Sequence, residues 1–354
     1  MDNLHRSALL QSLSNTISDY RLGEIAPITP AHVERWLNQF DTDDQPVILA
    51  EMDSLMKRFY FSKVRVKQYL RSFIRNDIIA ARDPRKLLPH VHFLHIQQTG
   101  NSQSVLLDIV DEILREDYQY SIAICSTANI YAYMYIDDCI YTGNRLRYDM
   151  TGEEGSVAWI PKEAPPGCRL LVYTITVHVD GLNYVKQHLH SAAEKKNIAL
   201  TGKYSLKIDN THSLNSKAEF LWPEKLTADP LIDAYTTNLR AILAQRNLSN
   251  YDLFRYSGVP SQESFFSSSE ARRVVEKAFL KKGIQIVTAS QNPAESIRPL
   301  GFAKKVSLGF GTVFVTYRNI ANNCPLVLWW GDPSMPRTHP LGKWYPLFPR
   351  RTNL

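Results

Sequence analysis

The chain has 354 residues, of which 44% are hydrophobic and 21% charged, and its formal net charge is +6. This composition is typical of a globular protein, and the length predicts two compact domains or one large domain with additions. No apolar run reaches the about 18 residues of a membrane span, and the first residues lack the apolar core of a secretory signal. The four cysteines form no Cys-x-x-Cys pair, so we expect a cytoplasmic protein with reduced thiols and no membrane partner.

The first 88 residues predict a helical region. Thr29 followed by Pro30 is a favoured helix start, because the Thr side chain caps the backbone amides and Pro fits the first turn. Apolar residues recur at helical spacing in three stripes, at 33–40, 48–59 and 66–73. We expect these stripes to be packing surfaces, and a linker at 83–85.

From residue 89 the pattern changes to alternating strands and helices. Strands are expected at 91–96, 131–136, 170–177 and within 198–208. Such alternation predicts a mostly parallel sheet with helices on its faces.

The C-terminal third mixes helices with short strands. A helix is expected to stop at Gly283, and strands are expected at 284–287, 312–317 and 325–330. The whole chain is thus predicted to be α/β, in three parts: a helical N-terminal region (1–88), a core with a mostly parallel sheet (89–225), and a C-terminal α+β extension with a basic tail (226–354).

One segment carries the strongest chemical signal. An apolar strand is followed by Asp137 and Asp138, and then by a polar loop that leads into a helix, Tyr141-Thr142-Gly143-Asn144-Arg145. Parallel sheets bind ligands beyond the carboxyl ends of their strands, and loop amides at a helix N-terminus bind anions. Two carboxylates suit the vicinal hydroxyls of a ribose, and a glycine lets the backbone approach a phosphate. The pattern therefore predicts a site for ribose 5-phosphate.

This segment resembles the thirteen-residue signature of type I phosphoribosyltransferases, in which four apolar residues precede two acids, two apolar residues and a Thr-Gly phosphate loop. The resemblance implies a sheet of phosphoribosyltransferase type. It also implies that Asp137 and Asp138 are the catalytic acids, holding the ribose 2- and 3-hydroxyls, while Tyr141 to Arg145 hold the 5-phosphate. Arg145 stands where Thr is commoner, so a guanidinium would replace one hydroxyl.

Three further segments narrow the resemblance: the helix residues Trp36, Leu37 and Phe40, the loop Thr99-Gly100-Asn101-Ser102, and the run 322–330. Together they are similar to PRTase-CE, the phosphoribosyltransferase-like proteins of bacterial conflict systems, over about residues 30–330. That family implies an effector or sensor of antiphage defence, with a retron reverse transcriptase or another protein of the defence operon as partner.

The loop Thr99-Gly100-Asn101-Ser102 corresponds to the family's diphosphate loop, which implies phosphoribosyl diphosphate or a nucleotide as the ligand. Segment 97–104 contains no Lys or Arg, so Mg²⁺ would supply the missing positive charge. Two functions stay open. One is transfer or cleavage at the anomeric carbon of a ribose 5-phosphate donor, and the other is non-catalytic sensing of a nucleotide.

Two other interpretations compete for the same acids. Tyr135-Ile136-Asp137-Asp138 also matches the Tyr-x-Asp-Asp of reverse transcriptases, whose acids bind two metal ions. A polymerase palm needs a third carboxylate on a neighbouring strand, and no acid stands at an upstream strand end. Alternatively, the acids only solvate the end of a strand beside an ordinary turn.

Positive charge gathers near the C-terminus. Residues 296–354 contain eight Lys or Arg against one acid, Asp332, and aromatic residues are interleaved with them. A basic and aromatic segment of this kind favours contact with nucleic acid, as part of an assembly. The alternative is a solvated basic surface.

Overall fold

The computed structural model describes residues 2–80, 82–152, 158–225, 228–248, 252–290 and 294–350. The chain divides into two compact units: unit 1 comprises Met1–Lys63 and Thr211–Leu354, and unit 2 comprises Val64–Asn210. This division differs from the three consecutive segments expected (1–88, 89–225 and 226–354), because both ends of the chain contribute to unit 1.

Unit 2 is built on a sheet of four parallel strands in the order β2-β3-β4-β5, which confirms the predicted α/β fold with a mostly parallel sheet. The strands are β2 (Val91–Phe93), β3 (Ala132–Ile140), β4 (Arg169–His178) and β5 (Ala199–Ile208). β3 continues four residues beyond its expected end, with Asp137 opposite Thr174 and Ile140 opposite Val177. The two candidate acids therefore lie inside the strand.

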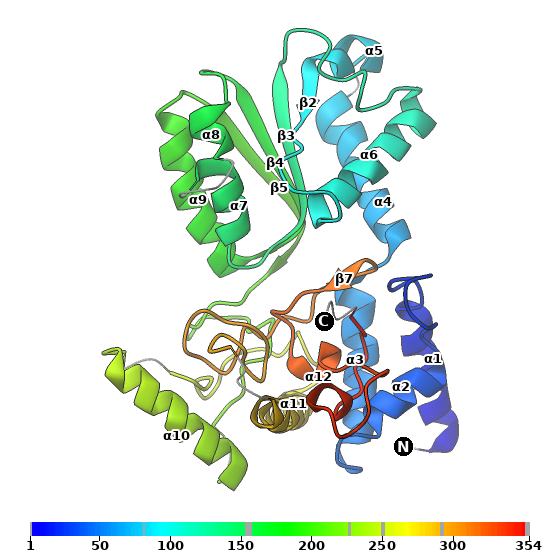
Figure 1. Cartoon of the computed structure of the whole chain (residues 1–354), viewed down its shortest axis with the longest axis vertical. Coiled ribbons are helices and arrows are strands. Elements are labelled where there is room, and N and C mark those ends of the chain that lie inside the picture. Colours follow the sequence, from blue (N-terminus) through cyan, green and yellow to red (C-terminus); the bar gives the residue numbers. More distant parts are fainter. Residues whose placement is uncertain are drawn as a thin grey trace. The chain divides into compact units, whose positions relative to one another are not determined.

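Helices cover both faces of this sheet, with α7, α8 and α9 on one face and α4 and α6 on the other (Figure 1). Trp159 of α8, Leu146 of α7 and Val185 of α9 share one buried apolar cluster with the strands. On the opposite face the Tyr69 hydroxyl of α4 donates to the Thr174 carbonyl (2.9 Å). The helical elements of unit 2 are α4 (Lys63–Phe73), the π-helical η1 (Ile74–Ile79), α5 (Pro84–Leu87), the 3₁₀ turn η2 (Leu88–His90), α6 (Ser102–Tyr118), α7 (Asn144–Thr151), α8 (Trp159–Lys162) and α9 (Val179–Glu194).

Unit 1 is mainly helical. Its helices are α1 (Asn3–Thr16), α2 (Pro30–Leu37), α3 (Gln45–Phe59), α10 (Pro230–Gln245), α11 (Ser269–Ala289), α12 (Leu326–Trp329) and the 3₁₀ turn η3 (Pro340–Gly342). Thr29 caps α2 as predicted, accepting from the His32 amide. A small sheet pairs β1 (Tyr60–Phe61) in parallel with β6 (Val315–Thr316), which pairs antiparallel with β7 (Asn319–Ile320). None of the helices in the described ranges has both the length and the apolar character needed to cross a bilayer.

Three local predictions in the chain are wrong. Residues 284–287 belong to helix α11, which also contains Gly283. A glycine is needed at 283 because a Cβ there would come 2.7 Å from the Pro299 carbonyl oxygen. In place of the strand expected at 325–330, the structure has the short helix α12 (Leu326–Trp329), whose Val327 carbonyl accepts from two tryptophan indoles. The expected linker at 83–85 begins helix α5, with Asp83 as its cap.

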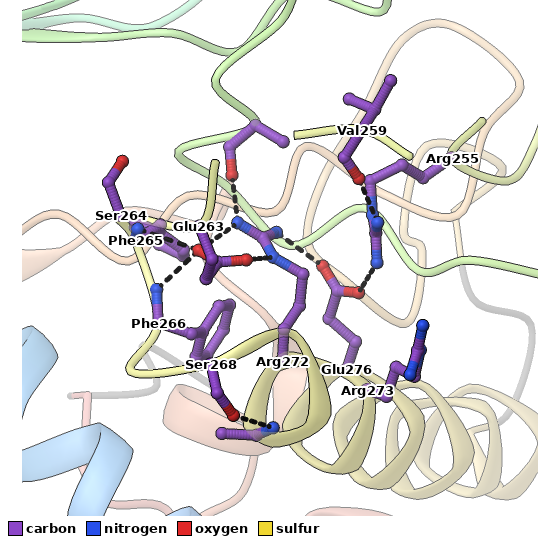
Figure 2. A network of polar contacts seen from close by, with 12 residues as sticks. Arg255, Val259, Glu263, Ser264, Phe265, Phe266, Ser268, Arg272, Arg273 and Glu276 are labelled. Carbon is purple, nitrogen blue, oxygen red and sulfur yellow. Dashed lines mark hydrogen bonds and ion pairs between the residues drawn. The ribbon is translucent and has the colours of Figure 1, made fainter. Parts of the chain in front are cut away.

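A buried ion network joins α11 to the loops that contain Ala218, Arg255 and Glu263 (Figure 2). Arg272, which is fully buried, contacts Glu263 (2.5 Å) and Glu276 (3.0 Å), and Glu276 also contacts Arg255 (3.2 Å). Arg272 further donates to the Ala218 carbonyl (2.7 Å). Two cations balance two anions, which is the condition under which charges are tolerated away from water.

Candidate functional site

The two candidate acids lie next to each other near the carboxyl end of β3, in different environments. Asp137 is buried, at 7% exposure, whereas Asp138 is only partly buried. Oδ1 of Asp137 accepts from the Ser102 hydroxyl and from the Asp138 backbone amide (2.8 Å). Oδ2 accepts from Gln97 Nε2 (2.8 Å) and from the Tyr135 hydroxyl (3.1 Å). Asp137 is thus satisfied within the protein, and Asp138 is the more accessible acid.

A second buried carboxylate, Asp149 of α7, shares these donors. Its Oδ2 lies 2.8 Å from the Tyr135 hydroxyl and 3.2 Å from Gln97 Nε2. Burial raises the pKa of Asp149, and the charge of Asp137 acts in the same direction. Burial and the two carboxylates also raise the pKa of Tyr135 well above its usual range. Asp149, beside Tyr135 and Asp137 of β3, is therefore a carboxyl that is easier to protonate than an exposed Asp.

The predicted phosphate loop lies where the sequence places it, between β3 and α7. Helix α7 begins at Asn144, directly after Gly143, which has a φ of +79°. A Cβ at Gly143 would lie 2.6 Å from the Gly181 carbonyl oxygen, and one at Gly181 would lie 2.0 Å from the Tyr141 carbonyl oxygen. Gly143 is therefore required for packing against α9, a role that the sequence pattern did not indicate.

Thr142 and Arg145 of this loop have polar contacts. The Thr142 hydroxyl accepts from the Asn144 amide at 3.5 Å. Arg145 is exposed on the first turn of α7, and its guanidinium lies 4.0 Å from Asp149 Oδ1. A positive side chain thus stands at the N-terminal end of α7, where the helix dipole also favours an anion.

The predicted diphosphate loop leads into α6. Thr99 and Gly100 are exposed, and Asn101 and Ser102 are partly buried at the start of that helix. Because the Ser102 hydroxyl donates to Asp137, the structure brings this loop to the candidate acids. The loop base is held by Gln103, whose side-chain oxygen accepts from the amides of residues 96 (2.7 Å) and 97 (2.8 Å).

Three residues of this network were missed by sequence reasoning: Gln97, Tyr135 and Asp149. Asp149 follows Arg145 at the i+4 spacing of a helical ion pair, and this was the available signal. Gln97 and Tyr135 carry no comparable pattern, since they share partners only where the loop after β2, strand β3 and helix α7 meet.

The polymerase interpretation lacks its third carboxylate. The strands that flank β3 contain no Asp or Glu over Val91–Phe93 and Arg169–His178. Within the described ranges, no group of three or more His, Cys, Asp or Glu side chains is placed to hold a metal ion. A site for two metals, as nucleotidyl transfer requires, is therefore not supported by these residues.

Among the comparisons with known proteins, only a family model matches this chain. No curated protein and no solved structure has significant similarity to this chain. The family model PRTase-CE matches residues 33–350, which is nearly the whole chain. The resemblance drawn from the sequence is thereby confirmed, and the chain belongs to the PRTase-CE family.

Proposed function

We propose that unit 2 binds the ribose 5-phosphate moiety of phosphoribosyl diphosphate or of a nucleotide. The observation that carries this proposal is the arrangement at one strand end, where a half-buried acid, Asp138, is followed by a turn that leads directly into helix α7. The amides of residues 142–145 would take the 5-phosphate, and Arg145 would add positive charge. Asp138 would accept from a ribose hydroxyl.

Asp137 has a supporting part in this proposal. Both of its oxygens already accept from groups of the protein, so it orients Ser102 and the Asp138 amide instead of gripping the ribose directly. This departs from the equal roles that the family resemblance implies for the two acids.

A Mg²⁺ ion fits this proposal. Magnesium is commonly held by one or two carboxylates together with substrate phosphates, and no dedicated protein cage is needed. Asp138 would hold the ion jointly with the ligand. The ion would supply the positive charge that segment 97–104 lacks.

The catalytic and the sensing function would both use Asp138 and the amides of residues 142–145. Catalysis at an anomeric carbon needs groups that stabilise a developing positive charge and a leaving diphosphate. The buried, satisfied state of Asp137 and the absence of Lys and Arg from segment 97–104 favour sensing. A role in antiphage defence, beside a retron reverse transcriptase or another operon protein, follows from the resemblance and forms part of this proposal.

Calorimetry with ribose 5-phosphate, in the presence of Mg²⁺, tests the binding proposal. Ribose and inorganic phosphate, tested separately, should bind much more weakly than the joined molecule. Asp138→Asn and Arg145→Gln should each reduce affinity by about tenfold, because each removes a charged partner. Asp108→Asn, on the exposed face of α6, is the matched control and should bind as the wild type does. Equal affinities for Asp138→Asn and wild type would contradict the proposal.

A turnover assay then separates the two functions. The protein is incubated with phosphoribosyl diphosphate, nucleotides and Mg²⁺, and released diphosphate or free base is measured. Release that is lost in Asp138→Asn identifies an enzyme. Binding without release identifies a sensor.

A further inference from the structure

A second cavity, of about 460 Å³, lies in unit 1 and is unrelated to the acids of β3. Its walls come from three parts of the chain: the end of α2 and the residues after it, the C-terminal half of α11, and segment 332–345. This volume lies within the range of small-molecule sites and accommodates a mononucleotide.

Positive charge dominates the lining of this cavity. Arg35, Lys282, Arg337 and Lys343 line it, against one acid, Asp332. Lys282 contacts Asp41 (3.0 Å), which lies outside the cavity, so that cation is already balanced. The remaining three cations still exceed the single acid, and a concave surface of one sign concentrates anions.

The aromatic wall of the cavity is rigidly held. The Gln39 side chain donates to the Tyr345 carbonyl (2.8 Å) and accepts from the Tyr345 amide (2.7 Å). The Tyr345 hydroxyl bonds His32 Nδ1 (2.8 Å). The Arg35 guanidinium lies over the Tyr345 ring, 4.0 Å from its centroid. Arg35 is thereby held in place before any ligand arrives, which lowers the entropic cost of using it.

We infer that this cavity binds a phosphate monoester carried by a ligand of nucleotide size. Arg35, Arg337 and Lys343 bind the phosphate, since guanidinium and ammonium groups pair with its oxygens through charge-assisted hydrogen bonds. The inference goes beyond the proposed function, because this cavity lies in unit 1 and shares no residue with the site in unit 2. Two sources of such a phosphate are a free nucleotide and the 5′-phosphorylated end of a nucleic acid strand.

The test is a titration of the full chain with AMP at low salt, followed by NMR of ¹⁵N-labelled tryptophan. Trp344 lines the cavity, and its indole N–H donates to the Val327 carbonyl behind the cavity wall. This signal, assigned with Trp344→Phe, reports a ligand against the Trp344 ring and not one in unit 2. AMP should shift this signal, and adenosine should not. The double variant of Arg337→Gln with Lys343→Gln should bind at least about tenfold more weakly.

The matched control removes the same amount of positive charge at another place in unit 1. Lys304→Gln with Lys305→Gln changes two exposed lysines that do not line the cavity, and AMP affinity should stay within about twofold of the wild type. Three outcomes would overturn the inference: no shift with AMP, an equal shift with adenosine, or an equal loss in the two double variants.

Competition with short DNA strands identifies the source of the phosphate. A 5′-phosphorylated strand that displaces AMP, when its 5′-hydroxyl counterpart does not, points to strand ends. Displacement by neither strand points to free nucleotides. A 5′-hydroxyl strand that competes as well as the phosphorylated one contradicts recognition of a monoester.

Discussion

Asp137 and Asp138 show how neighbouring residues of one strand acquire different roles. Successive side chains of a strand point to opposite faces, so only Asp137 reaches the buried pair Gln97 and Tyr135. Asp137 therefore behaves as a core residue, and it does not solvate the end of a strand. Asp138 keeps partial exposure and is the better probe of ligand binding.

This difference predicts unequal costs of substitution. In Asp137→Asn the amide group must face a donor, either Gln97 Nε2 or the Asp138 amide, whichever way it is turned. One buried hydrogen bond is lost, so the free energy of unfolding should fall by about 1–3 kcal/mol. Asp138→Asn should cost less than about 1 kcal/mol. Urea unfolding of the two variants measures both values, and equal losses would show that the burial difference has no energetic consequence.

His178, at the end of β4, is a second residue whose chemical behaviour depends on burial. It is fully buried, its Nδ1 lies 3.2 Å from the Ile140 carbonyl oxygen, and burial lowers its pKa to about 4. Because a carbonyl only accepts, Nδ1 must carry the hydrogen in a neutral ring. The folded state disfavours the imidazolium, so His178 lowers stability as pH falls from about 6.5 toward 4, by on the order of 3 kcal/mol.

An NMR titration of the His178 ring measures this pKa directly, with assignment from His178→Gln. We expect a value near 4. Between pH 6.5 and 4.5, the free energy of unfolding should also fall less in His178→Gln than in the wild type. A measured pKa at or above 6.5 would contradict the buried, neutral state.

At the scale of elements, two glycines, Gly143 and Gly181, let the predicted phosphate loop pack closely against α9. Ala is normally better than Gly in a helix by about 1 kcal/mol. At Gly181, the third residue of α9, a Cβ would lie 2.0 Å from the Tyr141 carbonyl oxygen, and this clash exceeds the gain. Gly143→Val is consequently a poor test of phosphate binding, because it would disturb the same contact.

We expect Gly181→Ala to destabilise the protein by about 1–3 kcal/mol, as overpacking does. Gly202→Ala is the control, since no atom lies within 4 Å of a Cβ placed there on β5. Thermal unfolding of both variants compares them. A Gly181→Ala variant as stable as Gly202→Ala would mean that the loop moves aside without cost.

The elements that the sequence predicted well are those with a long periodic pattern. The capped helix after Thr29 and the apolar strand before Asp137 were found because local chemistry alone defines them. The strand predicted at 284–287 failed because Gly283 looks like a helix stop, whereas its true role is close packing with Pro299. Such a role depends on a segment that is distant in sequence until the chain folds.

The residues of the candidate site also fall into those that a local motif predicted and those that only the folded structure brings together. The acids and the predicted phosphate loop were visible as a contiguous motif, and in the structure the acids lie near the carboxyl end of β3 while the loop joins β3 to α7. Gln97 and Asp149 were not visible, because their shared contact with Tyr135 arises only when the loop after β2, strand β3 and helix α7 come together.

At the scale of the whole molecule, several cationic side chains of the basic C-terminal segment (296–354) are not available at the protein surface. Arg298 is buried, and Arg350 packs over Trp329 (4.2 Å to the ring centroid) and donates to the Ile320 carbonyl. Arg351 lies outside the described residues. Nucleic-acid contact through this segment stays a proposal, and it is best tested at Arg337 and Lys343, which line the unit 1 cavity.

The division into units predicts which fragment folds alone. A fragment of residues 64–210 contains α4, whose Tyr69 and Phe73 cover β4. It should unfold cooperatively in urea. The fragment 89–225, which follows the division expected from sequence, lacks this cover and should be less stable by several kcal/mol, because apolar side chains of the sheet are left exposed. Equal stability of the two fragments would contradict the assignment of α4 to unit 2.

The central claim is that the carboxyl end of β3 binds ribose 5-phosphate. A crystal structure of the protein with ribose 5-phosphate and Mg²⁺ tests it most directly. The account predicts the phosphate against the amides of residues 142–145 and a ribose hydroxyl within hydrogen-bond distance of Asp138. Ribose 5-phosphate bound elsewhere in unit 2, or a site left empty at a concentration at which calorimetry shows saturation, would contradict it.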